Sequence, residues 1–414
     1  MTAGSTAVCL HAVCLHKEVG RNEKCRRRFI GCRLLFLLPL PLFAQLTLGQ
    51  LSTEDHLAEP GFWPTQGHAS RDGFVGADTC AQCHAGIVAS QKATPMARTA
   101  MPASVSEILH SHTDLTFSAN HYSYRIQTNS GQSKYSVSDG PRTLSFPLFW
   151  AFGTGRVGQS YLFKKDDDRL YEARVTYFER LGTLGVTPFR DLLTPSGIDE
   201  AMYRPVAQAE VLRCFSCHTT AANIGGRFDE AHLVPGVTCE ACHGPGAEHV
   251  KAMSALLKGA PSSGKPEVFN PSHLSPTEQV EFCGACHSSW WDVKLSGAKG
   301  VSTTRSAPYR LVTSKCWGKG DERLTCAKCH DPHEQLQTNP ATYDKTCLQC
   351  HTLSSDLKKT PAAQVAAKSP GTACPVAVSN CTSCHMPKVL VPEMNDDFTD
   401  HRIRIARAGE AFPD

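Results

Sequence analysis

Residues 236–246 read Gly-Val-Thr-Cys-Glu-Ala-Cys-His-Gly-Pro-Gly, and the pentapeptide Cys-x-x-Cys-His at their centre occurs seven times in the 414 residues. Numbered one to seven along the chain, the copies are Cys80/Cys83/His84, Cys214/Cys217/His218, Cys239/Cys242/His243, Cys283/Cys286/His287, Cys326/Cys329/His330, Cys347/Cys350/His351 and Cys381/Cys384/His385. With 20 Cys and 19 His in the chain, chance would supply only about 0.04 such pentapeptides. The repetition therefore has a single cause.

This pentapeptide is the attachment signature of a c-type haem. On one helical turn, each of the two thiols can form a thioether to a vinyl group of the same porphyrin, and the adjacent His is held under the iron as its proximal ligand. The predicted cofactor is haem c, covalently attached at seven sites. The fourteen motif cysteines are its predicted attachment residues, and the seven motif histidines are predicted metal ligands.

Three other uses of paired cysteines fit the pattern less well. Structural zinc also uses Cys-x-x-Cys, but it takes four ligands and does not require a His after every pair. Thioredoxin-like redox pairs lie next to a βαβ pattern, which the sequence around these motifs lacks. A disulfide framework would not place a His after each of seven pairs. After residue 49, two cysteines lie outside the motifs, Cys316 and Cys374, and they are expected either to pair in an oxidising compartment or to be buried thiols.

Residues 1–49 are predicted to be a signal peptide. Arg26, Arg27, Arg28 and Arg33 precede an apolar run over residues 34–48. That run is shorter than a membrane span and contains two prolines, which favours cleavage; an uncleaved N-terminal membrane anchor is the alternative. The predicted location is the periplasm or the cell exterior.

Charge argues against a nucleic-acid partner. The chain carries a formal net charge of +3, and without residues 1–49 it has 35 basic and 37 acidic residues, a net charge of −2. No basic patch of the kind that nucleic acids require is visible. The expected partners are redox proteins, either a membrane donor or a soluble acceptor, and the haem-attachment machinery during maturation.

The spacing of the motifs indicates the organisation of the chain. The first cysteines of successive motifs are 134, 25, 44, 43, 21 and 34 residues apart. Within the long first interval, residues 121–178 show period-two alternation with turn sequences at 129–131 and 139–141. Aromatic residues along this segment are expected to form one buried side of a sheet. Elsewhere, residues 86–101, 247–258 and 275–286 are predicted helices.

The predicted fold is mainly α and irregular and haem-packed, with a small antiparallel β insertion between haem 1 and haems 2–7. The expected segments are a signal peptide (1–49), a linker (50–76), a first haem segment (77–120), a β-rich insertion (121–205), haems 2–4 (206–300) and haems 5–7 (301–414). The 365 residues after the signal give about 52 per haem, too few for an ordinary apolar core beside seven porphyrins. We therefore expect that the chain does not fold properly without haem.

Several segments resemble the cytochrome c-554-like family of multihaem cytochromes. They are residues 76–80, residues 94–97, residues 236–246, Cys329-His330-Asp331-Pro332-His333 and Cys384-His385-Met386-Pro387-Lys388. The resemblance covers residues 76–105 and 205–405. The smaller members of that family carry four haems and serve ammonia oxidation. Because this chain has seven motifs, their partners are not carried over.

The resemblance implies that each iron is held by two histidines, so distal ligands are expected among the ten histidines outside the motifs in residues 50–414. The strongest candidates are His249, His333 and His401, followed by His273 and His232. Because His333 lies too close in sequence to His330 to reach the iron that His330 holds, it is expected to serve a neighbouring haem. One of His110, His112 and His121 would suit haem 1, and His112 is taken here. Met96 is the alternative thioether ligand.

Iron with two strong ligands has no vacancy for a substrate and passes single electrons. The predicted function is therefore that of a heptahaem cytochrome relaying electrons. The alternative is an oxidoreductase that acts on a small nitrogen or sulfur oxyanion at one haem with an open distal position. Every motif ends in His rather than Lys, which favours the relay, whereas His351 of haem 6 has no obvious partner in the sequence.

Overall fold

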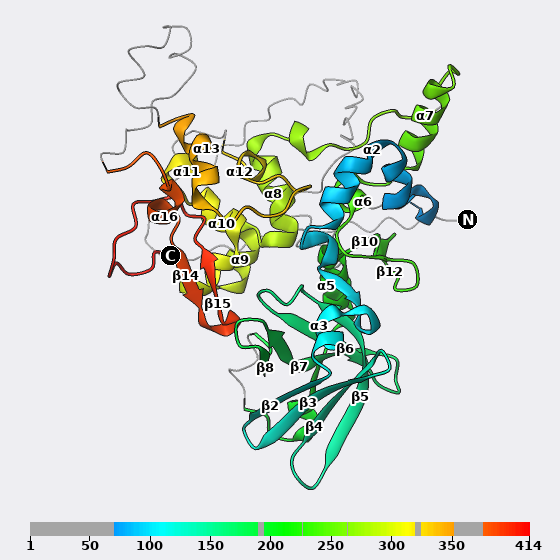
Figure 1. Cartoon of the computed structure of the whole chain (residues 1–414), viewed down its shortest axis with the longest axis vertical. Helices are drawn as coiled ribbons and strands as arrows, with labels where there is room; N and C mark the ends of the chain where they lie inside the picture. The colour runs from blue at the N-terminus through cyan, green and yellow to red at the C-terminus, as the bar shows by residue number, and fades with distance from the viewer. Residues whose placement is uncertain (1–69, 189–193, 226, 263, 319–323, 352–375) are drawn as a thin grey trace, which may run out of the picture. The chain divides into compact units, whose positions relative to one another are not determined.

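The computed structural model describes residues 70–188, 194–225, 227–262, 264–318, 324–351 and 376–414 (Figure 1). The predicted signal peptide, most of the predicted linker and Cys374 lie outside the described residues. Within the described ranges, no helix has both the length and the apolar character needed to cross a bilayer.

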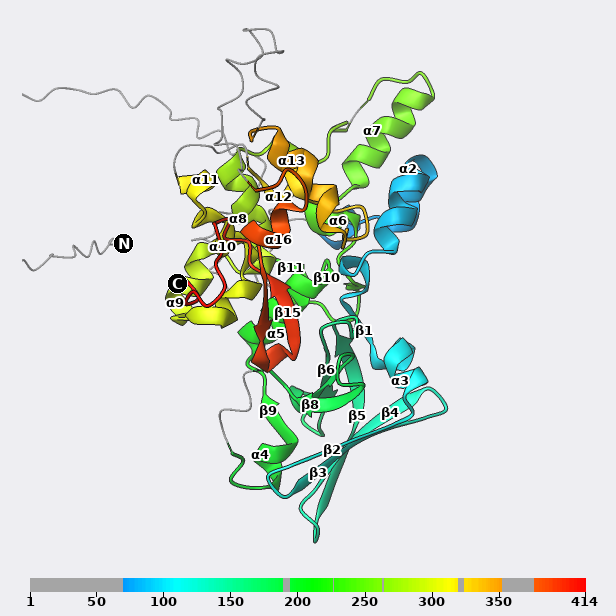
Figure 2. The same ribbon diagram turned by 60° about the vertical axis from the view of Figure 1, so that its left-hand side comes forward.

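An antiparallel sheet of nine strands occupies the long interval between motifs 1 and 2 (Figure 1). Its strands are β1 (Ala100–Pro102), β2 (Asp114–Ala119), β3 (Tyr122–Asn129), β4 (Gln132–Ser138), β5 (Thr143–Phe152), β6 (Gln159–Lys164), β7 (Leu170–Phe178), β8 (Thr183–Val186) and β9 (Tyr203–Pro205). Strands β2 to β8 follow one another in spatial order, while β1 pairs with β5 and β9 with β7. The outer strands β2 and β8 also meet, because Thr183 Oγ1 donates a hydrogen bond of 3.2 Å to the carbonyl of Thr116 (Figure 2).

The prediction of a mainly α fold with a small β insertion is wrong, because this sheet is one of the principal elements of the fold. The sheet also begins earlier than residue 121, with β1 and β2. Strands β1, β8 and β9 have only three or four residues each, too few to show period-two alternation in the sequence. Pairing with the long strands β5 and β7 holds them in the sheet.

The alternating aromatic residues form the buried face of this sheet, as predicted. Tyr124, Ile126, Tyr135 and Val137 are all at most 3% exposed, and Phe163 packs among them. Strands β3 and β4 are joined by the two-residue turn at residues 130–131, where both residues have positive φ, as hairpins of this length favour. The predicted turn therefore sets the register that buries the aromatic side.

A second apolar cluster connects the sheet to helix α5 (Gln208–His218), which carries motif 2. Phe215 of α5 is fully buried, and its ring meets that of Trp150 edge-on at 5.0 Å between centroids. Phe152 of β5 contacts both Phe215 and His218 in the same manner. The sheet thus fixes the position of the motif 2 histidine.

The remaining motifs lie on short helices. The helices besides α5 are α2 (Ala77–Lys92), α3 (Glu107–Ser111), α4 (Ile198–Met202), α6 (Cys239–His243), α7 (Ala247–Leu257), α8 (Pro276–His287), α9 (Trp290–Ser296), α10 (Ala307–Val312), α11 (Lys315–Gly318), α12 (Cys326–Cys329), α13 (Asp344–Leu348) and α16 (Cys381–His385). Two predicted helices, 247–258 and 275–286, are confirmed as α7 and α8. The predicted helix 86–101 instead ends at Lys92, shortly before Pro95, and begins at Ala77.

Single 3₁₀ turns and two-stranded ribbons complete the fold. The turns are η1 (Arg71–Gly73), η2 (Met96–Arg98), η3 (Ala103–Val105), η4 (Pro271–His273), η5 (Gly300–Arg305), η6 (Pro340–Tyr343) and η7 (Pro392–Met394). The ribbons pair β10 (Thr219–Thr220) with β13 (Val234–Pro235), β11 (Asn223–Ile224) with β12 (Arg227–Phe228), and β14 (Lys388–Val391) with β15 (Asp396–Thr399).

Candidate haem-binding sites

Each motif begins on a helical turn. Motifs 1, 2 and 4 lie within the longer helices α2, α5 and α8, and α6 and α16 coincide with motifs 3 and 7. Helix α12 holds both cysteines of motif 5 but ends before His330, whose backbone is extended. In a helix, residues three and four apart share one face, so the two cysteines and the histidine of such a motif point to the same side. This is the arrangement that attachment of one porphyrin requires.

Motif 6 departs from the expectation that both thiols of a motif lie on one helix. Cys347 lies in α13, but that helix ends at Leu348, so the predicted attachment residue Cys350 lies beyond it in a hydrogen-bonded turn. For Cys350 the prediction of a helical position is therefore wrong. The cause is a tightening of the chain at the end of this short helix, where the amide of Cys350 bonds to the carbonyl of Cys347 at 3.2 Å, three residues back.

The turn nevertheless keeps the spacing of motif 6 close to helical. The amide of His351 donates to the same Cys347 carbonyl at 3.0 Å, four residues back, as in an α-helix. Cys350 is half-buried, whereas His351 is exposed. Attachment of a haem through Cys350 thus stays a prediction.

Three motif histidines each face a histidine from elsewhere in the chain. The ring centroids of His84 and His249 are 6.4 Å apart, with 23° between the ring planes. Those of His243 and His333 are 6.0 Å apart and inclined by 7°. Those of His330 and His401 are 6.2 Å apart and inclined by 49°.

These separations fit two imidazoles on opposite sides of one iron. An imidazole–metal bond is about 2.0 Å long, so two such bonds on opposite sides of the metal, together with the radii of the two rings, give about 6.3 Å between the ring centres. Two imidazoles in van der Waals contact would stack closer than this. The chain therefore holds three histidine pairs at the spacing that bis-histidine haem requires.

Hydrogen bonds fix the orientation of several of these rings. The Nδ1 atoms of His243 and His249 lie 2.8 Å and 2.5 Å from the carbonyl oxygens of Phe269 and Pro266. That of His401 lies 3.0 Å from a backbone carbonyl at residue 399, and that of His333 lies 3.1 Å from an Asp331 carboxylate oxygen. An Nδ1–H that donates to such an acceptor leaves Nε2 unprotonated and directed away, ready to bind a metal.

Burial keeps several of the candidate ligands neutral. It lowers the pKa of His218 and of His401 to about 4 in each case. Burial also lowers the pKa of His243, His287 and His330 below the usual value. At neutral pH these side chains are uncharged imidazoles, the form that coordinates iron.

The cysteines of different motifs lie in contact. Thiols of different motifs lie close enough to shift one another's pKa, as in the pairs Cys80 with Cys239, Cys217 with Cys286, Cys283 with Cys326, and Cys347 with Cys381. These contacts bring together motifs 1 and 3, 2 and 4, 4 and 5, and 6 and 7. Motif 4 contacts two other motifs, one through each of its cysteines.

Comparison with known families agrees with this arrangement. The family model for cytochrome c554 and c-prime matches residues 196–244, and that for cytochrome c3 matches residues 319–392. The chain is a multihaem c-type cytochrome. The resemblance to the cytochrome c-554-like family is thereby confirmed, and membership implies covalently bound haem c.

Individual relatives are distant from this cytochrome. The multiheme cytochrome MtrA of Shewanella baltica (strain OS185) is 22% identical over 206 residues, which are 38% of this chain and 59% of the relative. The cytochrome thus matches little more than half the length of that protein. The crystal structure of the outer cell wall cytochrome OcwA matches 80% of each chain with 14% identity and a TM-score of 0.41.

The other predicted ligands of the cytochrome lie apart from these pairs. The His112 ring packs on Tyr177, with Nε2 3.2 Å from its hydroxyl, so the histidine beside His84 is His249. His232 is exposed, and its Nδ1 lies at hydrogen-bond distance, 3.0 Å, from a carboxylate oxygen of Asp229. His273 lies exposed in η4, and Met96 lies half-buried in η2.

Two carboxylates that sequence reasoning did not select join neighbouring motifs. Glu240 of motif 3 accepts hydrogen bonds from the backbone N–H groups of Val75 and Gly76, just before motif 1, and of Gly246, just after motif 3. Asp344 of α13 accepts from the amides of Asn380 and Cys381, and these N–H groups lower the pKa of Asp344, that of Cys381 most. The only sequence signal for either residue is an acidic side chain inside or beside a motif.

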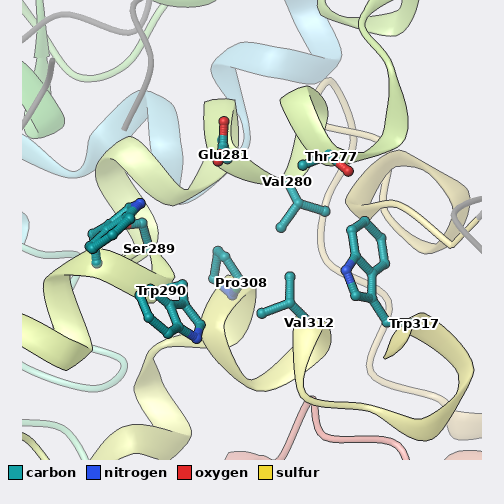
Figure 3. A pocket seen from close by; sticks show the side chains of 9 residues that line it. Thr277, Val280, Glu281, Ser289, Trp290, Pro308, Val312 and Trp317 are labelled. Atoms are coloured by element: carbon teal, nitrogen blue, oxygen red, sulfur yellow. The ribbon is translucent and has the colours of Figure 1, made fainter. Parts of the chain in front are cut away.

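A cavity of about 180 Å³ is lined in part by residues of α8 (Figure 3). Its walls hold three tryptophans, and its lining residues are Thr277, Val280, Glu281, Ser289, Trp290, Trp291, Pro308, Val312 and Trp317. No motif cysteine or histidine is among them, and the cavity is too small for a porphyrin. It is therefore separate from the haem attachment sites.

Proposed function

We propose that this cytochrome carries seven covalently attached haems and relays single electrons between partner proteins. The three histidine pairs carry this proposal, because two imidazoles at about 6 Å between ring centres leave no open position at a shared iron. Haem iron, when bound, supplies one-electron chemistry. The chain's part is to hold both axial ligands and exclude substrate.

The proposed ligation crosses between segments. His249, which follows motif 3, serves the haem of motif 1, and His333, which follows motif 5, serves the haem of motif 3. His401, which follows motif 7, serves the haem of motif 5. Each of these haems is then held by two separate segments, which supports a rigid arrangement with little reorganisation on electron transfer.

The thiol contacts support an order for the proposed relay. Haems 1 and 3 are neighbours, as are haems 6 and 7, because their cysteines touch. Haem 4 lies between haems 2 and 5, since Cys286 contacts Cys217 while Cys283 contacts Cys326. In this order haem 4 links haem 2 to haem 5.

The proposed location is the periplasm or the cell exterior, where c-type haems are attached. The proposed partners are a membrane donor or a soluble acceptor, together with the haem-attachment machinery during maturation. The near-neutral charge of residues 50–414 supports partner proteins over nucleic acid.

Mass spectrometry of the purified, exported protein tests the haem count, and seven porphyrin increments on the polypeptide mass are expected. Low-temperature electron paramagnetic resonance of the oxidised protein tests the ligation. Low-spin signals from all seven haems support the relay. A high-spin centre that shifts on addition of nitrite or hydroxylamine would instead support an oxidoreductase with one open haem.

The variants His249→Ala, His333→Ala and His401→Ala test the three pairings separately. Each is expected to convert one low-spin haem into a high-spin haem that binds cyanide. His232→Ala is the matched control, because its exposed ring pairs with Asp229 rather than with a motif histidine. A wild-type spectrum for any of the three ligand variants contradicts that pairing.

A further inference from the structure

Glu240 is a buried carboxylate within motif 3. It lies in α6 between Cys239 and Cys242, and only 3% of the residue is exposed. A carboxylate in such a place is costly unless hydrogen bonds satisfy both of its oxygens. In this protein backbone N–H groups satisfy both.

The three donors come from two helix N-termini. Glu240 Oε2 accepts from the amide of Gly76 at 2.8 Å, and Oε1 accepts from the amide of Val75 at 2.9 Å. Oε1 also accepts from the amide of Gly246 at 2.9 Å. Gly76 is the N-cap of α2 and Gly246 is the N-cap of α7.

A single negative charge therefore serves two helices. Neither glycine has a side chain to cap its helix, and a carboxylate is favourable at the positive end of each helix dipole. The position beside Gly246 is also close-fitting, since a Cβ there would lie 3.1 Å from Val75 Cγ2 and 3.4 Å from Glu240 Oε1. The absence of a side chain at residue 246 lets the carboxylate reach the backbone.

The two helices carry the two candidate ligands of haem 1. Helix α2 holds Cys80, Cys83 and His84, whereas α7 holds His249. Glu240 itself belongs to the helix of motif 3, whose Cys239 contacts Cys80. One side chain thus connects the proximal helix of haem 1, its distal helix and the attachment helix of haem 3.

We propose that Glu240 is the positioning residue for haem 1, holding His249 opposite His84 and fixing the spacing between haems 1 and 3. This inference rests on the proposed ligation of haem 1 by both histidines. The carboxylate is needed because the amide of a glutamine would turn N–H donors toward backbone N–H donors.

The test uses the full haem-loaded protein with Glu240→Gln. The expected result is one high-spin haem that binds cyanide, as in His249→Ala, together with weaker exciton coupling in the Soret circular dichroism. The reduction potential of one haem is expected to rise, because a buried negative charge that favours ferric iron is gone. The double variant Glu240→Gln/His249→Ala should add no second high-spin haem, since both changes release the same ligand.

Glu248→Gln is the matched control, because it removes the same charge from the exposed side chain next to His249. It should leave the spin state and the Soret coupling unchanged. Where Glu240→Gln does not accumulate, Glu240→Asp keeps the charge on a shorter side chain, and a smaller fraction of the same high-spin haem is expected.

The outcomes separate this inference from the ligation on which it rests. If His249→Ala leaves every haem low-spin, the proposed ligation fails. If His249→Ala produces the high-spin haem while the Glu240 variant keeps wild-type spin state, potential and Soret coupling, the role of Glu240 is refuted. The role of Glu240 is also refuted if Glu248→Gln gives the same spectrum as Glu240→Gln, because loss of a negative charge would then explain both spectra.

Discussion

The nine-stranded sheet and the motif-bearing segments fill their interiors differently. In the sheet, large side chains such as Tyr135, Tyr161 and Phe163 are fully buried against one another. In the described segments after residue 236, the largest fully buried side chain is Arg310, and apolar residues such as Leu295 and Leu336 are exposed. The chain alone supplies a core of large aromatic side chains for the sheet, whereas the motif segments bury fewer of them. Haem-dependent folding of the motif segments stays a prediction.

The largest effect is expected from removing the haems. When the full chain is produced without haem attachment, the motif segments should lose their protected structure while the sheet keeps its own, because only the sheet buries an apolar core without haem. Limited proteolysis with mass spectrometry should leave a resistant fragment within residues 100–205. If residues 236–414 resist the protease as well as the sheet does, the motif segments do not need haem in order to fold.

A substitution in the sheet core should unfold the sheet without changing haem ligation. Phe163 is fully buried, with its ring centroid 5.2 Å from that of Phe146 and 5.9 Å from that of Tyr135. Phe163→Ala should cost about 3–5 kcal/mol of the sheet's unfolding free energy. Near-ultraviolet circular dichroism during urea unfolding measures this loss, and the low-spin haem signals in native buffer should be unchanged.

A substitution in the motif segments should destabilise those segments instead of the sheet. Arg310 donates to both oxygens of Asp400 at 2.8 Å and 3.0 Å, and both side chains are fully buried. Arg310→Met leaves the Asp400 charge with Arg404 as its remaining arginine partner, and should cost about 3 kcal/mol of stability. Urea unfolding followed at the Soret band should show the loss.

Arg180→Met is the control for this variant. Arg180 forms an exposed ion pair with Asp397 in the neighbouring ribbon, and such pairs contribute at most about 1 kcal/mol. If both variants shift the Soret transition equally, burial of the Arg310–Asp400 pair has no special effect.

The smallest effect concerns acid stability at motifs 6 and 7. The amide of Cys381, and after it that of Asn380, lowers the pKa of Asp344, so the folded state favours the ionised carboxylate. This stabilisation is present above the carboxyl pKa of the unfolded chain, about 3.9, and is lost as the pH falls through the lower folded pKa. Asp344→Asn should flatten the acid side of a plot of unfolding midpoint against pH. An unchanged slope would mean that Asp344 does not contribute.

The motifs are visible in the sequence because each is a fixed pentapeptide, and the buried side of the sheet was predicted from its period-two alternation. Sequence reasoning underestimated the sheet, since β1 and β9 are too short to show alternation and are held by β5 and β7. It also placed Cys350 on a helix, because the pentapeptide carries no signal for where α13 ends.

The sequence offered His112 for haem 1, whereas the fold brings His249 to His84. Sequence separation gives no measure of distance once the chain has folded back on itself. Glu240 was missed for a different reason, because its partners are backbone amides, which have no residue signature.

The crossing of the histidine pairs also has a consequence in time. In each pair, two motifs separate the first histidine from the second; the pairs are His84 with His249, His243 with His333, and His330 with His401. The first histidine of a pair therefore leaves the ribosome long before the second. The site at motif 1 stays incomplete until motif 3 has passed, and that at motif 5 stays incomplete until His401 has been synthesised. Truncation after residue 400 should therefore leave an unfinished site at motif 5 while sparing the two synthesised earlier.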